Sequence, residues 1–135
     1  MADKNHMPFR ADQRAFPTIL VVASDLKMLK LLEMALSAEL ECEVLSITRG
    51  RSAVGTAQRV APDLVIIDAH LLDGNALELS DQLHSIKELE SVPSLLVNIP
   101  GAWWSFPQSD HTIFLRAPFV LVDFYTAVNK SLGRP

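Results

Sequence analysis

The chain has 135 residues, of which 49% are hydrophobic and 21% charged, and its net charge is −4 at pH 7. This composition is typical of one soluble globular domain, because the longest apolar run falls far short of the ~20 residues that a membrane span needs. With one cysteine, Cys42, no apolar signal segment and a weakly acidic balance, we expect a cytoplasmic protein that binds neither a membrane nor, directly, nucleic acid.

The first residues follow neither a helical nor a strand period. Residues 1–16 mix charged and apolar side chains, so we expect a flexible N-terminal leader ahead of a single domain at residues 17–135. An ordinary frayed terminus and a docking arm built on Phe9 and Phe16 both remain open.

Beyond the leader, short apolar stretches alternate with segments of helical periodicity. Strands are predicted at residues 18–22, 42–47, 64–68, 94–99 and 113–115. Helices are predicted at residues 26–39, 51–60 and 75–89, and a last helix follows residues 117–119 and ends at Gly133. Residues 100–112 carry too much turn chemistry for a long helix, so the fourth helix is expected to be short or irregular. Right-handed crossovers then predict an α/β three-layer sandwich, with a parallel sheet between helices.

One strand ends at a carboxylate. Leu64 to Ile67 are apolar without alternation and stop at Asp68, which is typical of a strand buried on both faces. Asp68 therefore lies at the carboxyl edge of the sheet, where open α/β sheets bind their ligands. Two other carboxylates have structural explanations. Asp25 is expected to be the N-cap of the first helix, unless the neighbouring Ser24 takes that position, and Asp73 is expected to be a turn residue.

This segment, Pro62-Asp63-Leu64-Val65-Ile66-Ile67-Asp68, resembles the phospho-acceptor strand in receiver domains of bacterial two-component response regulators. The resemblance covers about residues 17–133 and includes the first strand at 19–22, Asp73-Gly74, Val92-Pro93, and Pro118-Phe119 with the closing helix. It implies a five-stranded parallel sheet in the order 2-1-3-4-5, with flavodoxin-like topology. It also implies that Asp68 is equivalent to the phospho-acceptor.

The sequence departs from the family at most other site positions. Receivers hold Mg²⁺ with an acidic pair after the first strand, and Mg²⁺ needs several oxygen ligands. Ala23 and Ser24 stand at that pair, Asn98 at the family's Ser or Thr, and Ala117 at its lysine. We therefore expect no catalytic residues, no bound metal or cofactor, and an unphosphorylated Asp68 hydrogen-bonded to Ser24 or Asn98.

An alternative keeps the phosphorylation chemistry. If the first strand bulges by one residue, Asp25 could turn toward Asp68 and, with the carbonyl of His70, form a weak Mg²⁺ site. The His70 ring itself is expected to be a solvated loop side chain, because no second metal ligand stands at the required spacing.

Aromatic residues indicate where a partner would bind. Trp103, Trp104 and Phe106 lie in the segment that builds the partner-docking surface of receivers, although the two tryptophans would equally well fill the core. Phe114 matches the family's switch aromatic and is also a plausible core residue on the fifth strand.

Our first hypothesis is therefore a pseudo-receiver that binds another signalling protein, such as a kinase, regulator or output domain, without being phosphorylated. A homodimer is left open. A small-molecule-binding flavodoxin-like protein is disfavoured, because residues 23–26 contain no glycine and only one hydroxyl, that of Ser24, and so lack the run of glycines and hydroxyls that cradles a phosphate. An enzyme of another kind is disfavoured because no Ser/His/Asp or Cys/His arrangement is present.

Overall fold

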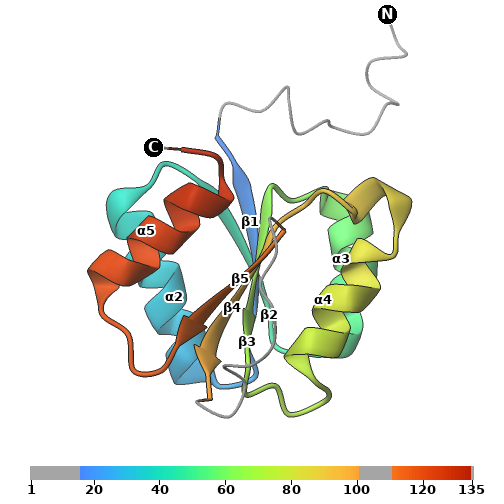
Figure 1. Cartoon of the computed structure of the whole chain (residues 1–135), viewed down its shortest axis with the longest axis horizontal. Helices are drawn as coiled ribbons and strands as arrows, with labels where there is room; N and C mark the ends of the chain where they lie inside the picture. The colour runs from blue at the N-terminus through green and yellow to red at the C-terminus, as the bar shows by residue number, and fades with distance from the viewer. Residues whose placement is uncertain (1–15, 101–110, 135) are drawn as a thin grey trace, which may run out of the picture.

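The computed structural model describes residues 16–100 and 111–134 (Figure 1). The strands are β1 (Thr18–Val22), β2 (Glu43–Ile47), β3 (Leu64–Asp68), β4 (Ser94–Ile99) and β5 (Thr112–Arg116). The helices are α2 (Leu26–Glu39), α3 (Ala53–Val60), α4 (Ala76–His84) and α5 (Leu121–Ser131), with 3-10 turns η2 (Gly50–Ser52) and η3 (Lys87–Leu89).

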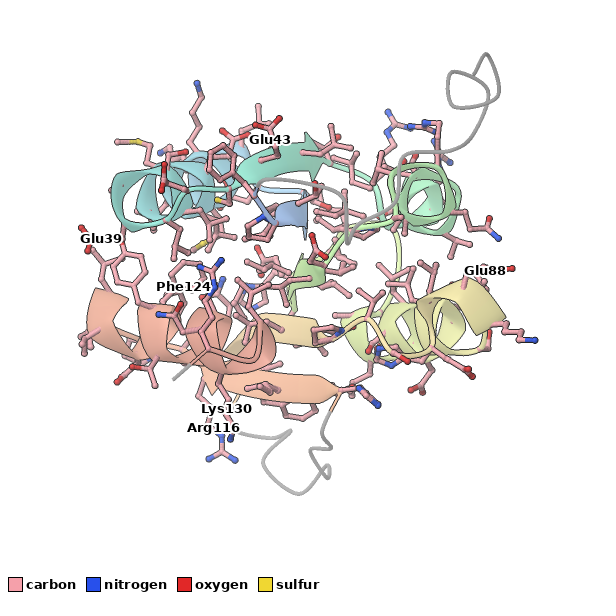
Figure 2. All side chains as sticks on the ribbon, turned by 90° about the horizontal axis from the view of Figure 1, so that it is seen from above. Glu39, Glu43, Glu88, Arg116, Phe124 and Lys130 are labelled. Atoms are coloured by element: carbon pink, nitrogen blue, oxygen red, sulfur yellow. The ribbon has the colours of Figure 1, made fainter. Side chains whose placement is uncertain are left out.

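The strands form one parallel sheet in the order β2-β1-β3-β4-β5, as the resemblance to receiver domains implied. Every residue of β1, β3 and β4 is buried, because these strands have a neighbour on each side and helices over both faces. The edge strands β2 and β5 contain no fully buried residue. Figure 2 shows Glu43 of β2 and Arg116 of β5 at the outside of the molecule, on opposite sides.

Helices cover the two faces of the sheet in pairs, α2 with α5 and α3 with α4 (Figure 1). Successive residues of β1 alternate between the two cores: Ile19 and Val21 pack toward α2 and α5, whereas Leu20 and Val22 pack toward α3 and α4. Phe124 of α5 is fully buried in the first core. Because the strands are parallel, their carboxyl ends meet at one edge of the sheet.

Two helix predictions need correction. The helix predicted at residues 75–89 ends at His84, where the Ser85 hydroxyl donates to the Gln82 carbonyl at 2.7 Å. Leu89 is still buried, because the 3-10 turn η3 returns it to the core. In the last helix, the i, i+3, i+4 spacing of Leu121, Phe124 and Val128 predicts that Leu121 faces inward. Leu121 is instead 50% exposed, because it is the first residue of α5 and precedes the buried residues Phe124, Ala127 and Val128.

Two other predictions concern residues outside the described ranges. Most of the predicted leader at 1–16 and the short or irregular fourth helix within 100–112 fall on residues 1–15 and 101–110. In the part of the chain that the structure describes, no helix has the length and apolar character to cross a bilayer.

Candidate functional site

Asp68 is a buried carboxylate at the end of β3, with only 1% of its surface exposed. Its Oδ1 accepts hydrogen bonds from the His70 backbone N–H at 3.0 Å and from Asn98 Nδ2 at 3.2 Å. A buried carboxylate is costly unless it is hydrogen-bonded, and these two donors supply that requirement. The His70 ring is 65% exposed and its Nδ1 lies 3.8 Å from Oδ1, in keeping with a solvated loop side chain.

Asn98 reaches Asp68 because β4 is irregular at this point. The pairing with β5 shifts register between Val97 and Ile99, which leaves Asn98 as an extra residue. Its φ is 62°, in the left-handed region that asparagine tolerates better than most residues. Bulges re-aim side chains at the ends of strands, and this one directs the amide onto the carboxylate. Of the two expected partners of Asp68, Asn98 makes the hydrogen bond.

Ala23 and Ser24 follow β1 at the same edge of the sheet. Ala23 is fully buried and has no polar side-chain atom. The Ser24 hydroxyl donates to the Thr48 carbonyl at 3.1 Å and accepts from the Leu72 N–H at 3.0 Å. The hydroxyl therefore joins the loop after β2 to the loop after β3, and both of its described contacts are to backbone groups.

Asp73 makes a second cross-link between the same two loops. Its Oδ1 accepts from the Gly50 N–H at 2.8 Å and its Oδ2 from the Arg51 N–H at 3.1 Å. The hydrogen bond from Gly50, and then that from Arg51, lower the pKa of the Asp73 carboxyl.

The sequence predicted only a turn residue at Asp73 and missed this link. The available signal was the residue before η2: Arg49 occupies the N-cap position and offers no capping side chain. The first N–H groups of the helical segment therefore need an acceptor from elsewhere in the chain.

No protein-family model matches this sequence, and no curated protein matches it. Solved structures do match. The signal receiver domain of a signal transduction histidine kinase from Syntrophus aciditrophicus superposes with a TM-score of 0.76 at 21% identity, over 87% of this chain and 90% of that one. A chemotaxis response regulator of Vibrio cholerae gives 0.76 at 16% identity, over 87% and 100%. The receiver domain of a sensor histidine kinase from Pseudomonas aeruginosa PAO1, solved with a magnesium ion coordinated in its active site cleft, gives 0.74 at 19% identity, over 88% and 99%.

The chain has the receiver fold. A receiver fold implies a Mg²⁺ ion beside the aspartate, but the residues here do not fit one. Asp25 accepts from the Lys27 N–H at 3.0 Å and caps α2. The bulge that would turn Asp25 toward Asp68 is not present, because β1 pairs with β2 and β3 in unbroken register. Within residues 16–100 and 111–134, no three His, Cys, Asp or Glu side chains are grouped as metal ligands.

The remaining receiver positions lie on the other side of Asp68. Ala117, at the receiver lysine position, follows β5, is exposed and offers a methyl group in place of an ammonium. Phe114 is half-buried and packs against the core beneath α3 and α4. Trp103, Trp104 and Phe106, the predicted partner-binding residues, lie outside the described residues.

Proposed function

We propose that the chain is a pseudo-receiver, a phosphorylation-independent protein-binding module of bacterial two-component signalling. The observation that carries the proposal is the burial and hydrogen bonding of the Asp68 carboxylate. Its carboxylate is 1% exposed, and its Oδ1 is occupied by the His70 N–H and the Asn98 amide. Because both hydrogen bonds go to Oδ1, attack on a phosphoryl donor would have to come from Oδ2, and at 1% exposure the residues that cover the carboxylate must move first.

The residues around Asp68 provide few of the groups that phosphoryl transfer requires. Phosphoryl transfer depends on positioning and on cationic or hydrogen-bonding groups that stabilise the equatorial oxygens. Ala23 and Ala117 supply methyl groups where receivers carry charged side chains, and the Ser24 hydroxyl is engaged by two backbone groups. Transfer to Asp68 would therefore be slow, and a regulatory role would have to operate without it.

A candidate protein-binding surface lies on α2. Leu26, Leu31 and Met34 are 65%, 48% and 68% exposed, and with Lys27 and Lys30 they line an open hollow of about 480 Å³. Apolar residues with a basic rim are complementary to an amphipathic helix that carries acidic residues. Two copies of this surface would oppose their lysines, which favours a different signalling protein as the partner.

A phosphorylation assay tests the first half of the proposal. The protein is incubated with acetyl phosphate and Mg²⁺, and its intact mass is compared with that of Asp68→Ala and of a receiver that is phosphorylated under the same conditions. We expect no phosphoryl adduct on the wild-type chain. A Mg²⁺-dependent adduct that disappears in Asp68→Ala would contradict the proposal and support the alternative, a working phospho-receiver.

A pull-down with purified candidate kinases, regulators and output domains tests the second half. We expect a partner that still binds Asp68→Ala but loses at least about tenfold in affinity to Leu31→Glu/Met34→Glu or to Trp103→Ala/Trp104→Ala. Ser37→Glu is the matched control, since Ser37 is exposed on α2 and does not line the hollow. A partner lost in Asp68→Ala and retained by the surface variants would overturn the proposal.

A further inference from the structure

A second hollow lies at the carboxyl edge of the sheet, beside but separate from the Asp68 site. It has a volume of about 360 Å³ and is lined by Ser24, Thr48, Arg49, Arg51, Leu72 and Asp73. Neither Asp68 nor Asn98 lines it. Ligand pockets in proteins are typically about 300–1,000 Å³, and open α/β sheets place them at this edge. Its size and position are those of a site for a small molecule.

The walls of this hollow are cross-linked. The Ser24 hydroxyl joins the Thr48 carbonyl to the Leu72 N–H. The Asp73 carboxylate, in turn, holds the backbone N–H groups of Gly50 and Arg51. The loops after β1, β2 and β3 are thereby tied to one another, so the hollow is formed before any ligand arrives. A preformed site loses less conformational entropy on binding than one that must assemble.

Two guanidinium groups give the hollow its chemistry. Arg49 and Arg51 are exposed, and among the described residues their side chains make no hydrogen bond or close ion pair. Asp73 is the opposing charge: it lies near enough to Arg51 for the arginine to contribute to its lowered pKa. Both Asp73 oxygens already accept backbone N–H groups. With two arginines and one aspartate, the lining residues carry a net charge of about +1.

We infer that this hollow binds a small molecule through a phosphate group, which Arg49 and Arg51 hold. A guanidinium presents a planar pair of N–H donors that matches phosphate oxygens, and Thr48 lines the same hollow. Leu72 is 87% exposed at this hollow and offers an apolar contact for the organic part of the ligand. The backbone N–H groups of Gly50 and Arg51 contribute nothing, since Asp73 occupies them.

A receiver fold whose aspartate does not accept phosphate would then still respond to a signal, because the signal would be a ligand that binds without forming a covalent bond. The inference does not depend on the proposed function, because the phosphate is carried by the ligand and no bond to Asp68 forms. Because the arginines are exposed, salt should screen their charges and weaken binding. We expect inorganic phosphate alone to bind with a Kd on the order of 1 mM.

Titration of the full chain with inorganic phosphate and with phenyl phosphate, followed by two-dimensional NMR of the backbone amides at low ionic strength, tests the inference. We expect saturable shifts centred on Thr48, Arg49, Arg51 and Leu72, with tighter binding of phenyl phosphate. Arg49→Gln/Arg51→Gln should weaken both ligands at least about tenfold. Arg59→Gln is the matched control, since Arg59 is an exposed arginine at the end of α3 that does not line the hollow.

Three results would overturn the inference. They are unchanged affinity in the double arginine variant, an equal loss in Arg59→Gln, and shifts centred on Asp68 that vanish in Asp68→Ala. The single variant Arg49→Gln is the substitute if the double variant does not give the dispersed spectrum of a folded protein. Phosphate binding that persists in Asp68→Ala would support the inference, whatever the phosphorylation assay shows.

Discussion

The hydrogen bond between Asn98 and Asp68 can be measured with a double-mutant cycle. The variants are Asn98→Gly, Asp68→Ala and the double substitution. Glycine is chosen because φ at position 98 is 62°, where alanine would add backbone strain of its own. The backbone effect of glycine is the same with and without Asp68, so it cancels from the coupling free energy.

The structure sets the expected magnitude. A hydrogen bond to a charged group contributes about 1.5–3 kcal/mol to stability. The Nδ2 to Oδ1 distance of 3.2 Å is at the long end of the usual range, so we expect a coupling of about 1.5 kcal/mol. Asp68 keeps the His70 N–H in Asn98→Gly, which prevents complete loss of its hydrogen bonding.

Urea denaturation at pH 7, followed by circular dichroism, gives the free energy of unfolding of the four proteins. Tyr125→Phe combined with Asp68→Ala is the control cycle, because the Tyr125 hydroxyl donates to the Ala35 carbonyl and not to Asp68. That pair should be additive to within about 0.5 kcal/mol. A coupling of the same small size between positions 98 and 68 would refute the view that Asn98 restrains the carboxylate.

Three further predictions follow from the charges and packing. The pKa of Asp73 is lowered in the folded state, so its contribution to stability is present above the unfolded-state pKa of about 3.9 and is lost as the pH falls through the folded-state value. Urea midpoints of the wild type and Asp73→Asn should therefore differ at pH 7 and converge in acid; a constant difference would count against the cross-link. Phe124→Ala should reduce the free energy of unfolding by about 3–5 kcal/mol, because Phe124 is fully buried, and a loss below about 1 kcal/mol in the same assay would contradict this. Burial raises the pKa of the Cys42 thiol, so iodoacetamide at pH 8 should modify it more slowly in the folded protein than in urea, and equal rates would disprove the assignment.

The fold could be predicted because the central strands and their helices carry unambiguous patterns. Residues 18–22, 64–68 and 94–99 were predicted with the bounds that the structure gives, since each is a continuous apolar run flanked by turn or capping residues. The helix at residues 75–89 was predicted too long because periodicity reports which side chains are buried. Leu89 is buried like the apolar residues of the helix although it lies in a 3-10 turn, so the apolar spacing could not show where the helix ends.

The candidate site was predictable in residue type but not in geometry. The run that ends at Asp68 identified the central carboxylate, and the replacements at Ala23, Ser24 and Ala117 follow from the resemblance. Which neighbour would contact Asp68 depended on the register shift in β4, and register arises from the pairing of two strands. The arginine-lined hollow was missed for a similar reason, because Arg49 and Leu72 come together only when the loops after β2 and β3 meet.

The open sheet has a consequence for how the protein behaves when it is concentrated. Within the described sheet, β2 and β5 each have a single neighbouring strand, and a free strand edge can template fibril growth. Glu43 on β2 and Arg116 on β5 place a charge on each exposed margin. Like charges would face each other if two β2 edges or two β5 edges met, so both of these edge-to-edge pairings are disfavoured when the protein is concentrated.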